Sequence, residues 1–318
     1  MSAMAVGERL APLSMQRAER DFAGFADALG ASFRDTGFAI ITDHGLDEAV
    51  IADALAATKA FFALPEADKR RYHVPGGGGQ RGYTPFGVEA AKGAAASDLK
   101  EFWHVGRRLP HGHLLETYMP ANIAVDHPAD FDAATYNLFE AMDRLGLQLL
   151  RAIAAHLGLA FDYFDAACRD GNSILRLLHY PAQQTPPPPG SVRAGAHEDI
   201  NVITLLLGAE EAGLQVRTKD GDWLDINPEK GAAVVNIGDM LQRLCNHALP
   251  STTHRVVNPA ADRAGFARYS MPFFLHFRPD FVIKTLPTCL GPGAPDLYST
   301  PITAQEFLDE RLREIRLK

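Results

Sequence analysis

Hydrophobic positions in the first half of the chain alternate between helical and strand spacing. Apolar residues recur every three or four positions over residues 16–34 and 47–64, which predicts two amphipathic helices. The run GFAIIT between them has the composition of a buried strand. We expect Asp47 to cap the second helix and Pro65 to mark its end. A longer pattern over Phe131–Leu157 predicts a scaffold helix that packs on the core.

From residue 173 onward the chain has the composition of many short strands. The segments are bounded by turns and rich in β-branched and aromatic side chains, as in a sandwich or jelly roll. They are SILRLLHY, GLQVR, DWLDI, AAVVNI, HRVVN and ARYSMPFFLHF. A last helical pattern, Thr303–Leu317, begins with Thr303 and Glu306 in the positions of a capping box. The patterns together indicate an α+β fold in which helices buttress a β-rich core.

Two loop segments are marked by their glycine and proline content. Four consecutive glycines, Gly76–Gly79, restrict the backbone little, so we expect a mobile loop there. It is either a lid over a pocket or a solvated surface loop. The prolines of Pro186–Gly190 favour extended polyproline geometry. We expect both segments to close over bound substrate.

Length and charge narrow the class of protein. The 318 residues, 47% of them hydrophobic, suffice for a large buried core. We expect an N-terminal helix and strand part, residues 1–120, to pack on a catalytic core, residues 121–318, as one compact unit. A net charge of −8 argues against binding nucleic acid by neutralising its phosphates. The expected partners are therefore small molecules.

Cysteine spacing and the lack of a long apolar run predict a cytoplasmic protein. Cys168, Cys245 and Cys289 are far apart and form no CxxC motif, which favours reduced thiols. The N-terminal stretch lacks the apolar region of a signal peptide, and no apolar run reaches the length that spans a bilayer. We therefore expect no membrane partner, and the sequence leaves the oligomeric state open.

The residues with the most distinctive chemistry are a set of potential metal ligands followed by an anion anchor. His197 and Asp199 are two apart, so on a strand they share a face, and His254 follows downstream. Two imidazoles and one carboxylate leave positions open on an octahedral ion, as in non-haem Fe(II) oxygenases. Arg268 and Ser270, again two apart, form a fork for a carboxylate. A lone His-x-Asp is common by chance, but the joint pattern predicts a redox iron with an organic acid beside it.

The blocks that carry these residues resemble a known family. HEDINVITLLL, HRVVNP and RYSMPFF are similar to segments of the isopenicillin N synthase-like family of 2-oxoglutarate and Fe(II)-dependent oxygenases. Gly37–Leu46 and Arg81–Gly106 resemble the N-terminal part of that family. The resemblance implies a double-stranded β-helix, or jelly-roll, core. It also implies that iron binds at His197, Asp199 and His254 and that an acid is held by Arg268 and Ser270.

Further candidates follow from this resemblance. Tyr180 precedes Pro181, where the family has Asn-x-Tyr-Pro and the tyrosine helps to bind the acid. Leu178 stands in place of the asparagine, so we expect the hydroxyl contact without the amide contact. Arg176 shares a strand face with Tyr180 and either presents charge to a substrate or is an exposed strand cation. The remaining pocket candidates are Arg81, Tyr83, Phe86, Phe102 and Trp103.

The resulting hypothesis is a dioxygenase with Fe(II) and 2-oxoglutarate as co-substrate. It would hydroxylate, desaturate or cyclise an unidentified small organic molecule with dioxygen. One alternative is an Fe(II) oxidase of the isopenicillin N synthase type, in which Arg268 and Ser270 hold the substrate and 2-oxoglutarate is not used. Another is a non-catalytic jelly-roll module that binds a ligand or zinc. Structural zinc normally has four ligands, and only three candidates are present.

Overall fold

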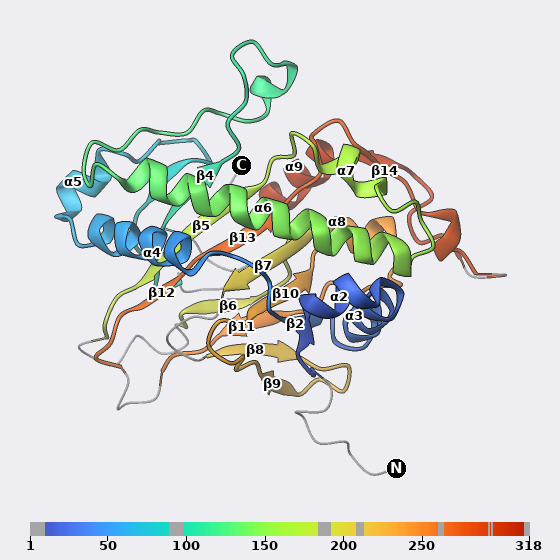
Figure 1. The fold of residues 1–318 in the computed structure, drawn as a ribbon. Coiled ribbons are helices and arrows are strands. Elements are labelled where there is room, and N and C mark those ends of the chain that lie inside the picture. The colour runs from blue at the N-terminus through green and yellow to red at the C-terminus, as the bar shows by residue number, and fades with distance from the viewer. Residues whose placement is uncertain are drawn as a thin grey trace.

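Two large β-sheets, one two-stranded sheet and a layer of helices form the described part of the computed structural model (Figure 1). The structure describes residues 10–88, 98–183, 192–207, 213–259, 264–291, 293 and 295–314. Within these residues the large sheet has nine strands. Their order is β1 (Leu13–Ser14), β2 (Phe38–Thr42), β10 (Ala233–Ile237), β7 (Ile203–Leu207), β13 (Pro272–Leu275), β5 (Ile174–Tyr180), β4 (Glu101–Gly106) and β3 (Gly82–Thr84), with β12 (Arg268–Ser270) also paired to β5. The order of the smaller sheet is β6 (Ala194–His197), β11 (His254–Val256), β8 (Leu214–Arg217) and β9 (Trp223–Asp225). This arrangement confirms the predicted jelly-roll core.

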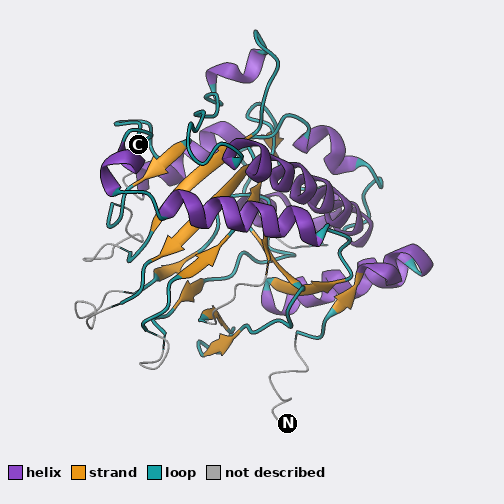
Figure 2. Ribbon diagram, turned by 60° about the vertical axis from the view of Figure 1, so that its left-hand side comes forward, coloured by secondary structure: helices purple, strands orange, loops and turns teal. Residues whose placement is uncertain are grey.

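Helices cover one face of the large sheet (Figure 2). The longest, α6 (Phe131–His156), packs against both α3 (Phe22–Thr36) and α4 (Glu48–Phe62). Gly146 lets α6 approach the sheet closely, because a Cβ at this position would lie 2.4 Å from Leu275 Cδ1. The fully buried side chains between the two layers include Phe33, Phe61, Leu149, Leu205 and Phe273. Burial of each such side chain contributes roughly 1.5–3 kcal/mol, so this layer anchors the sheet.

The structure also contains several smaller elements. They are α2 (Met15–Arg20), α5 (Glu66–Arg70), α7 (Tyr163–Cys168), α8 (Asp239–Leu244), α9 (Ala304–Glu314), β14 (Val282–Ile283), β15 (Ile302–Thr303) and two short 3-10 helices, Leu114–Thr117 and Pro287–Cys289. Strands β14 and β15 pair with each other. In the part of the chain that the structure describes, no helix is long and apolar enough to cross a membrane.

Helix boundaries follow the capping residues, and one boundary was predicted wrongly. A single helix over residues 16–34 was expected, but the chain forms α2 and α3. Asp21 separates them, because its backbone leaves the helical region and its carboxylate accepts a hydrogen bond from Gly24 N. The predicted cap at Asp47 is confirmed by its bond from Ala49 N, at 2.8 Å. Pro65 lies between α4 and α5 as the N-cap of α5.

Helix α9 begins at the predicted capping box. The backbone N–H of Glu306 donates to Thr303 Oγ1 at 3.2 Å, and Thr303 N donates to Glu306 Oε2 at 2.9 Å. The predicted end of this helix at Leu317 and the predicted closing segment Pro186–Gly190 both lie outside the described residues.

Strands from the N-terminal part belong to the large sheet. β2 pairs with β10, and β4 pairs with β5, so strands far apart in sequence are neighbours. Along β5 the residues alternate between two environments. Leu175 and Leu177 are buried in the helix-covered core, whereas Arg176, Leu178 and Tyr180 share the opposite face. The division of the chain near residue 120 stays a prediction.

A buried ionic cluster lies where β4 meets α5. Glu101, only 3% exposed, accepts hydrogen bonds from Lys69 Nζ at 2.6 Å and from the Tyr83 hydroxyl. His179 Nδ1 is also 2.6 Å from this carboxylate, so His179 faces the cluster. Burial raises the pKa of Glu101, but the hydrogen bonds from His179, Lys69 and Tyr83 outweigh burial and hold the pKa below its ordinary value.

We expect Glu101→Gln to lower the free energy of unfolding at pH 7 by about 3 kcal/mol, because Lys69 then loses its buried counterion and keeps only a partly exposed carboxylate nearby. The pKa of Glu101 is lower in the folded than in the unfolded chain. Its stabilisation is therefore present above the ordinary pKa of 4.5 and is lost as the pH falls through the folded-state pKa. Urea unfolding as a function of pH measures both effects.

The control for this change is Glu66→Gln, which removes a second carboxylate near Lys69. Glu66 is 46% exposed and lies 3.4 Å from Lys69 Nζ, so its loss should cost less than about 1 kcal/mol. Equal losses in the two variants would contradict the special role of the buried carboxylate.

Candidate metal and ligand site

The three predicted metal ligands converge at one end of the smaller sheet. His254 of β11 lies directly opposite His197 of β6. Asp199 Oδ1 is 3.8 Å from Nε2 of each histidine, and the three candidate ligand atoms all lie within 4.8 Å of one another. The expectation that one strand carries both His197 and Asp199 was wrong, because β6 ends at His197. A backbone bond from Asp239 N to Asp199 O, at 2.8 Å, holds the turn that follows.

Backbone carbonyls orient both imidazole rings. His197 Nδ1 is 2.7 Å from Gly195 O, and His254 Nδ1 is 3.1 Å from Thr252 O. Since a carbonyl only accepts, each Nδ1 carries the hydrogen and donates it. Each Nε2 then presents its lone pair to the space shared with Asp199, as in metal-binding histidines.

The carboxylate of Asp199 has one oxygen held by the protein and the other directed at the histidines. Thr204 Oγ1 and Asn236 Nδ2 donate to Oδ2, the second at 2.8 Å. Both partners are 4% exposed, in the otherwise apolar strands β7 and β10. Sequence analysis missed these two residues. A single asparagine in AAVVNI and a threonine in VITLLL were the signals that could have identified them.

The protonation states of these groups suit a divalent cation. Burial, aided by the nearby His254, lowers the pKa of His197 to about 4, so this ring is neutral at pH 7. Burial raises the pKa of Asp199, but the two histidines and the bonds from Asn236 and Thr204 outweigh it and lower the pKa overall. Neutral imidazole and ionised carboxylate are the ligand forms that Fe(II) takes in an open facial site. The donor set therefore fits the implied iron.

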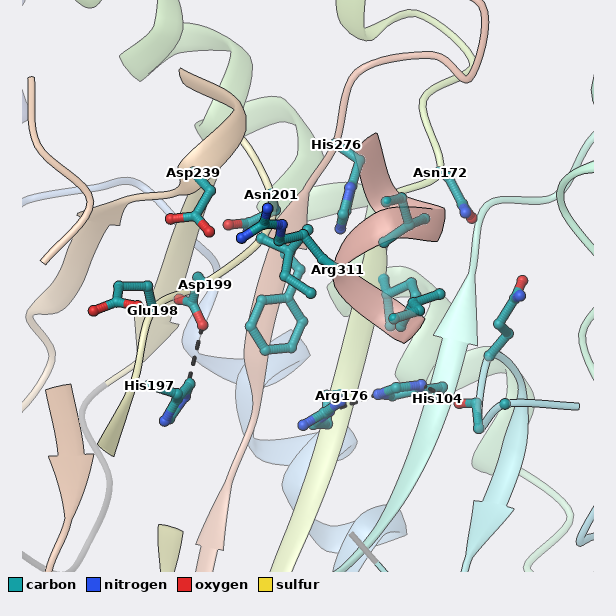
Figure 3. Close-up of a pocket in the computed structure, with 18 of the residues that line it drawn as sticks. His104, Asn172, Arg176, His197, Glu198, Asp199, Asn201, Asp239, His276 and Arg311 are labelled. Atoms are coloured by element: carbon teal, nitrogen blue, oxygen red, sulfur yellow. Dashed lines mark hydrogen bonds and ion pairs between the residues drawn. The ribbon is translucent and has the colours of Figure 1, made fainter. Parts of the chain in front are cut away.

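A cavity of about 440 Å³ lies beside these ligands, a volume typical of small-molecule sites (Figure 3). His197 and Asp199 are on one side, and Arg176 and His104 are on the other. His276 is also in the wall, where burial lowers its pKa to about 4. Additional wall residues are Gly78, Gly79, Gln80, Asp98, Lys100, Asn172, Asp239, Phe274, Leu308, Arg311 and Leu312.

The residues predicted to hold an acid come together on the face of the large sheet that lies opposite the helices, here called the inner face. Arg268 of β12 pairs with Tyr180 of β5, and Ser270 pairs with Leu178. Directly opposed residues point to the same face, and all four are buried. The Arg268 guanidinium is 5.1 Å from the Tyr180 ring. Leu178, which replaces the family's asparagine, packs with Tyr180 in a small apolar cluster.

Arg193 is a further buried cation beside Tyr180, and sequence analysis missed this residue. Its guanidinium lies 5.8 Å from the Tyr180 ring, and the side chain is 1% exposed. Two guanidinium groups thus contact one tyrosine. The segment around Arg193 carries no pattern that distinguishes it from an ordinary surface arginine.

The remaining pocket candidates occupy different positions. Trp103 and Tyr83 are buried in the helix-covered core, and Phe86 is 47% exposed. Arg81 is buried against Gly106 and donates to Asn172 Oδ1 at 3.4 Å, so it supports the cavity wall from behind. Phe102 lies on the inner face, where it contacts Arg176.

Two further segments contribute to the cavity wall. The glycine-rich loop supplies Gly78 and Gly79, so it borders the cavity, although its closure stays a prediction. Helix α9 supplies Leu308, Arg311 and Leu312. Its helical pattern indicated a terminal helix but gave no sign of which face meets a ligand.

Comparison with known proteins identifies the class to which this fold and site belong. The family described as non-haem dioxygenase in morphine synthesis N-terminal matches residues 10–127, and the 2OG-Fe(II) oxygenase superfamily matches residues 171–277. The 2-oxoglutarate-Fe(II) type oxidoreductase hxnY of Emericella nidulans is 32% identical over 283 residues, covering 86% of this chain and 79% of the relative. The chain therefore belongs to the 2-oxoglutarate and Fe(II)-dependent oxygenases.

Other relatives agree with this identification. The proline hydroxylase buaE of Petromyces alliaceus is 34% identical over 301 residues, covering 91% of this chain and 92% of the relative. A protein of Caulobacter crescentus assigned to the 2OG-Fe(II) oxygenase family has a structure with a TM-score of 0.90, 52% identity, and coverage of 96% of this chain and 99% of that chain. A full-length Neurospora crassa protein, solved with alpha-KG (2-oxoglutarate) and thymine, has a TM-score of 0.84 at 29% identity, with coverage of 95% of this chain and 96% of that chain.

Membership of this family decides between the hypotheses drawn from the sequence. The chain is an enzyme that oxidises a small molecule with Fe(II) and 2-oxoglutarate. The family assignment argues against both alternatives, the 2-oxoglutarate-independent oxidase and the non-catalytic binding module.

We expect Asp199→Ala to abolish stoichiometric Fe(II) binding without unfolding the protein, because it removes the anionic ligand from the converging set. Anaerobic calorimetry measures the affinity. The neighbouring Glu198→Gln is the matched control, since the Glu198 carboxylate accepts a hydrogen bond from Thr253 and should be dispensable for iron. Retained stoichiometric binding in Asp199→Ala would refute the ligand assignment.

Proposed function

We propose that His197, Asp199 and His254 bind Fe(II), and that Arg268, Ser270 and Tyr180 bind the distal carboxylate of 2-oxoglutarate. The observation that carries the proposal is the convergence of two Nε2 atoms and one carboxylate oxygen beside the cavity. Three ligands of this kind leave positions on the metal for the keto acid and for dioxygen.

The charge of the inner face supports the assignment of the 2-oxoglutarate anchor. Arg268 is 3% exposed, and Arg193 contacts the same tyrosine ring. A carboxylate placed there gains charge-assisted hydrogen bonds and lowers the cost of keeping guanidinium groups away from water. Ser270, on the same face as Arg268, supplies a hydroxyl that can donate to the same carboxylate.

The overall reaction that we propose is hydroxylation. One dioxygen molecule, 2-oxoglutarate and a substrate C–H bond give succinate, carbon dioxide and a C–OH group, with one oxygen atom entering succinate and one entering the product. Bound Fe(II) supplies the redox chemistry of this conversion. The chain's own residues orient the two organic molecules and limit the access of water.

Orientation of the ligand set comes from neighbouring polar groups. Asn236 and Thr204 hold one oxygen of Asp199, which keeps the other directed at the metal position. Side chains of α9 and the backbone of the glycine-rich loop line other parts of the cavity, so they limit the size of the substrate.

Relatives suggest the size and polarity of the substrate. One relative is named a proline hydroxylase, and another has a structure with thymine, and both compounds are small polar rings. We propose that this enzyme takes a compound of similar size. The predicted cytoplasmic location remains to be measured.

We expect Arg268→Lys to weaken 2-oxoglutarate binding by about 10- to 100-fold, because lysine keeps the charge but loses the planar fork. Fe(II) affinity should be nearly unchanged. Titration of 2-oxoglutarate into the anaerobic Fe(II) protein, followed by the metal-to-ligand charge-transfer band, measures the effect.

Arg255→Lys is the matched control, because Arg255 follows His254 in β11 and instead bonds Gln215 and covers Trp223. If the Arg268 variant binds 2-oxoglutarate as tightly as this control, Arg268 is not the anchor.

A further inference from the structure

Asn172 and His276 are neighbours in the cavity wall and are labelled in the upper part of Figure 3. His276 N donates to Ser173 Oγ at 3.2 Å, and Asn172 N donates to Phe277 O at 3.4 Å, so the two segments are held together. Gly171 permits this close approach, because a Cβ there would lie 2.1 Å from His276 O. Asn172 is 4% exposed and His276 is 7% exposed, so solvent satisfies little of their hydrogen-bonding capacity.

A guanidinium behind the wall fixes the orientation of the Asn172 amide. Arg81 Nη2 is 3.4 Å from Asn172 Oδ1, and since arginine only donates, the amide turns its oxygen toward Arg81. The Nδ2 group of Asn172, which only donates, has no acceptor among the residues that the structure describes. Arg81 is 4% exposed and has no acidic partner in the same part of the chain, so its charge polarises the amide and strengthens Nδ2 as a donor. An oxygen of a ligand can supply the acceptor.

The ring of His276 supplies the second polar group. Burial lowers its pKa to about 4, although the carboxylate of Asp199 opposes this effect, so the ring is neutral at pH 7. A neutral imidazole has one N–H donor and one accepting nitrogen. Neither ring nitrogen is hydrogen-bonded within the described ranges, and the residue lines the cavity. The pair therefore offers a donor from Asn172 and a neutral imidazole to one ligand.

This pair lies far from the proposed 2-oxoglutarate anchor. Arg268 is opposite Tyr180 at one end of β5, whereas Phe274 is opposite Ile174 at the other end. An extended strand of this length spans roughly 20 Å, and Asn172 precedes Ile174 in the chain. A molecule of 2-oxoglutarate held by Arg268 is too short to reach Asn172. The ligand of the pair is therefore the primary substrate.

We propose that Asn172 and His276 bind an uncharged amide group of the primary substrate, so that the enzyme oxidises a small amide or lactam. The amide oxygen accepts from Asn172 Nδ2, and the amide N–H donates to the accepting nitrogen of His276. A ketone offers the oxygen alone, and a carboxylate has no hydrogen to donate. This inference rests on the proposed function, since it assigns the substrate class of the same cavity.

The test uses the full-length protein with Fe(II) and 2-oxoglutarate under anaerobic conditions. The probes are γ-butyrolactam, δ-valerolactam and benzamide, compared in turn with ketones of the same shape, cyclopentanone, cyclohexanone and acetophenone. Benzoate is the charged counterpart of benzamide. Binding is followed by the change that each probe causes in the charge-transfer band. We expect at least one amide to reach half-saturation at a concentration roughly tenfold below that of its ketone, because the ketone lacks one hydrogen bond. In air, that amide should also raise succinate formation.

Two variants separate the roles of the pair. Asn172→Asp keeps the shape and the bond from Arg81 but replaces the donor with an oxygen, so it should weaken the amide and its ketone alike, by roughly tenfold or more. His276→Phe keeps a ring but removes both nitrogens, so it should weaken the amide to the level of its ketone and leave the ketone unchanged. Both variants should still form the charge-transfer band with 2-oxoglutarate, which shows that they are folded and hold iron.

Asn137→Asp and His111→Phe are the matched controls, because both residues are exposed, and both should respond as the wild type does. Four results would each overturn the inference. They are equal binding of amides and ketones by the wild type, tighter binding of benzoate than of benzamide, no response to any amide in the band or in succinate formation, and variants that match their controls.

The band of the wild type with 2-oxoglutarate alone tests the proposed function separately. A missing band would contradict that function and this inference with it. A normal band together with any of the four results would contradict the amide site alone.

Discussion

The site depends on the different contacts of the two carboxylate oxygens of Asp199. Thr204 and Asn236 donate to Oδ2, and Oδ1 is left facing Nε2 of both histidines. Without these donors, the buried carboxylate would be free to rotate toward other hydrogen-bond partners. The same two donors belong to β7 and β10 of the large sheet, so they tie the metal position on the smaller sheet to the larger one.

The two sheets together bring residues that are far apart in sequence into one site. The pairing of β6 with β11 brings His197 opposite His254, and the pairing of β5 with β12 brings Tyr180 opposite Arg268. The first pair belongs to the proposed iron site, and the second belongs to the proposed anchor for 2-oxoglutarate. The helix layer fixes the large sheet from its other face, with α6 approaching closely at Gly146. Function thus depends on packing that lies entirely outside the cavity.

Sequence reasoning succeeded where chemistry and local periodicity coincide. The amphipathic pattern identified α6 to within one residue, and the residue types identified three candidate ligands that the fold brings together. It placed Asp199 on the strand of His197, which was wrong, because alternation was assumed to continue past the end of β6. It also placed Tyr83 and Trp103 near the pocket, although both face the helices. Segment resemblance locates a strand but leaves open which face each side chain takes.

Other features depend on tertiary structure and could not be read from the chain alone. Nothing in the pattern of α9 reveals that Arg311 faces the cavity, and an ordinary helix cap at Asp21 divided a continuous apolar pattern. The position of Arg176 was recognised, but its bond to His104 requires the register between β4 and β5. The pairing of strands that are far apart in sequence determines how the side chains of the cavity are placed. The residue types indicate the class of reaction.

The most direct test of the central claim is anomalous diffraction at the iron edge from anaerobic crystals that contain Fe(II) and 2-oxoglutarate. Our account predicts a single strong iron peak bonded to His197 Nε2, Asp199 Oδ1 and His254 Nε2. The distal carboxylate of 2-oxoglutarate should lie against Arg268. Iron bound at other residues, or a carboxylate held away from Arg268, would contradict it.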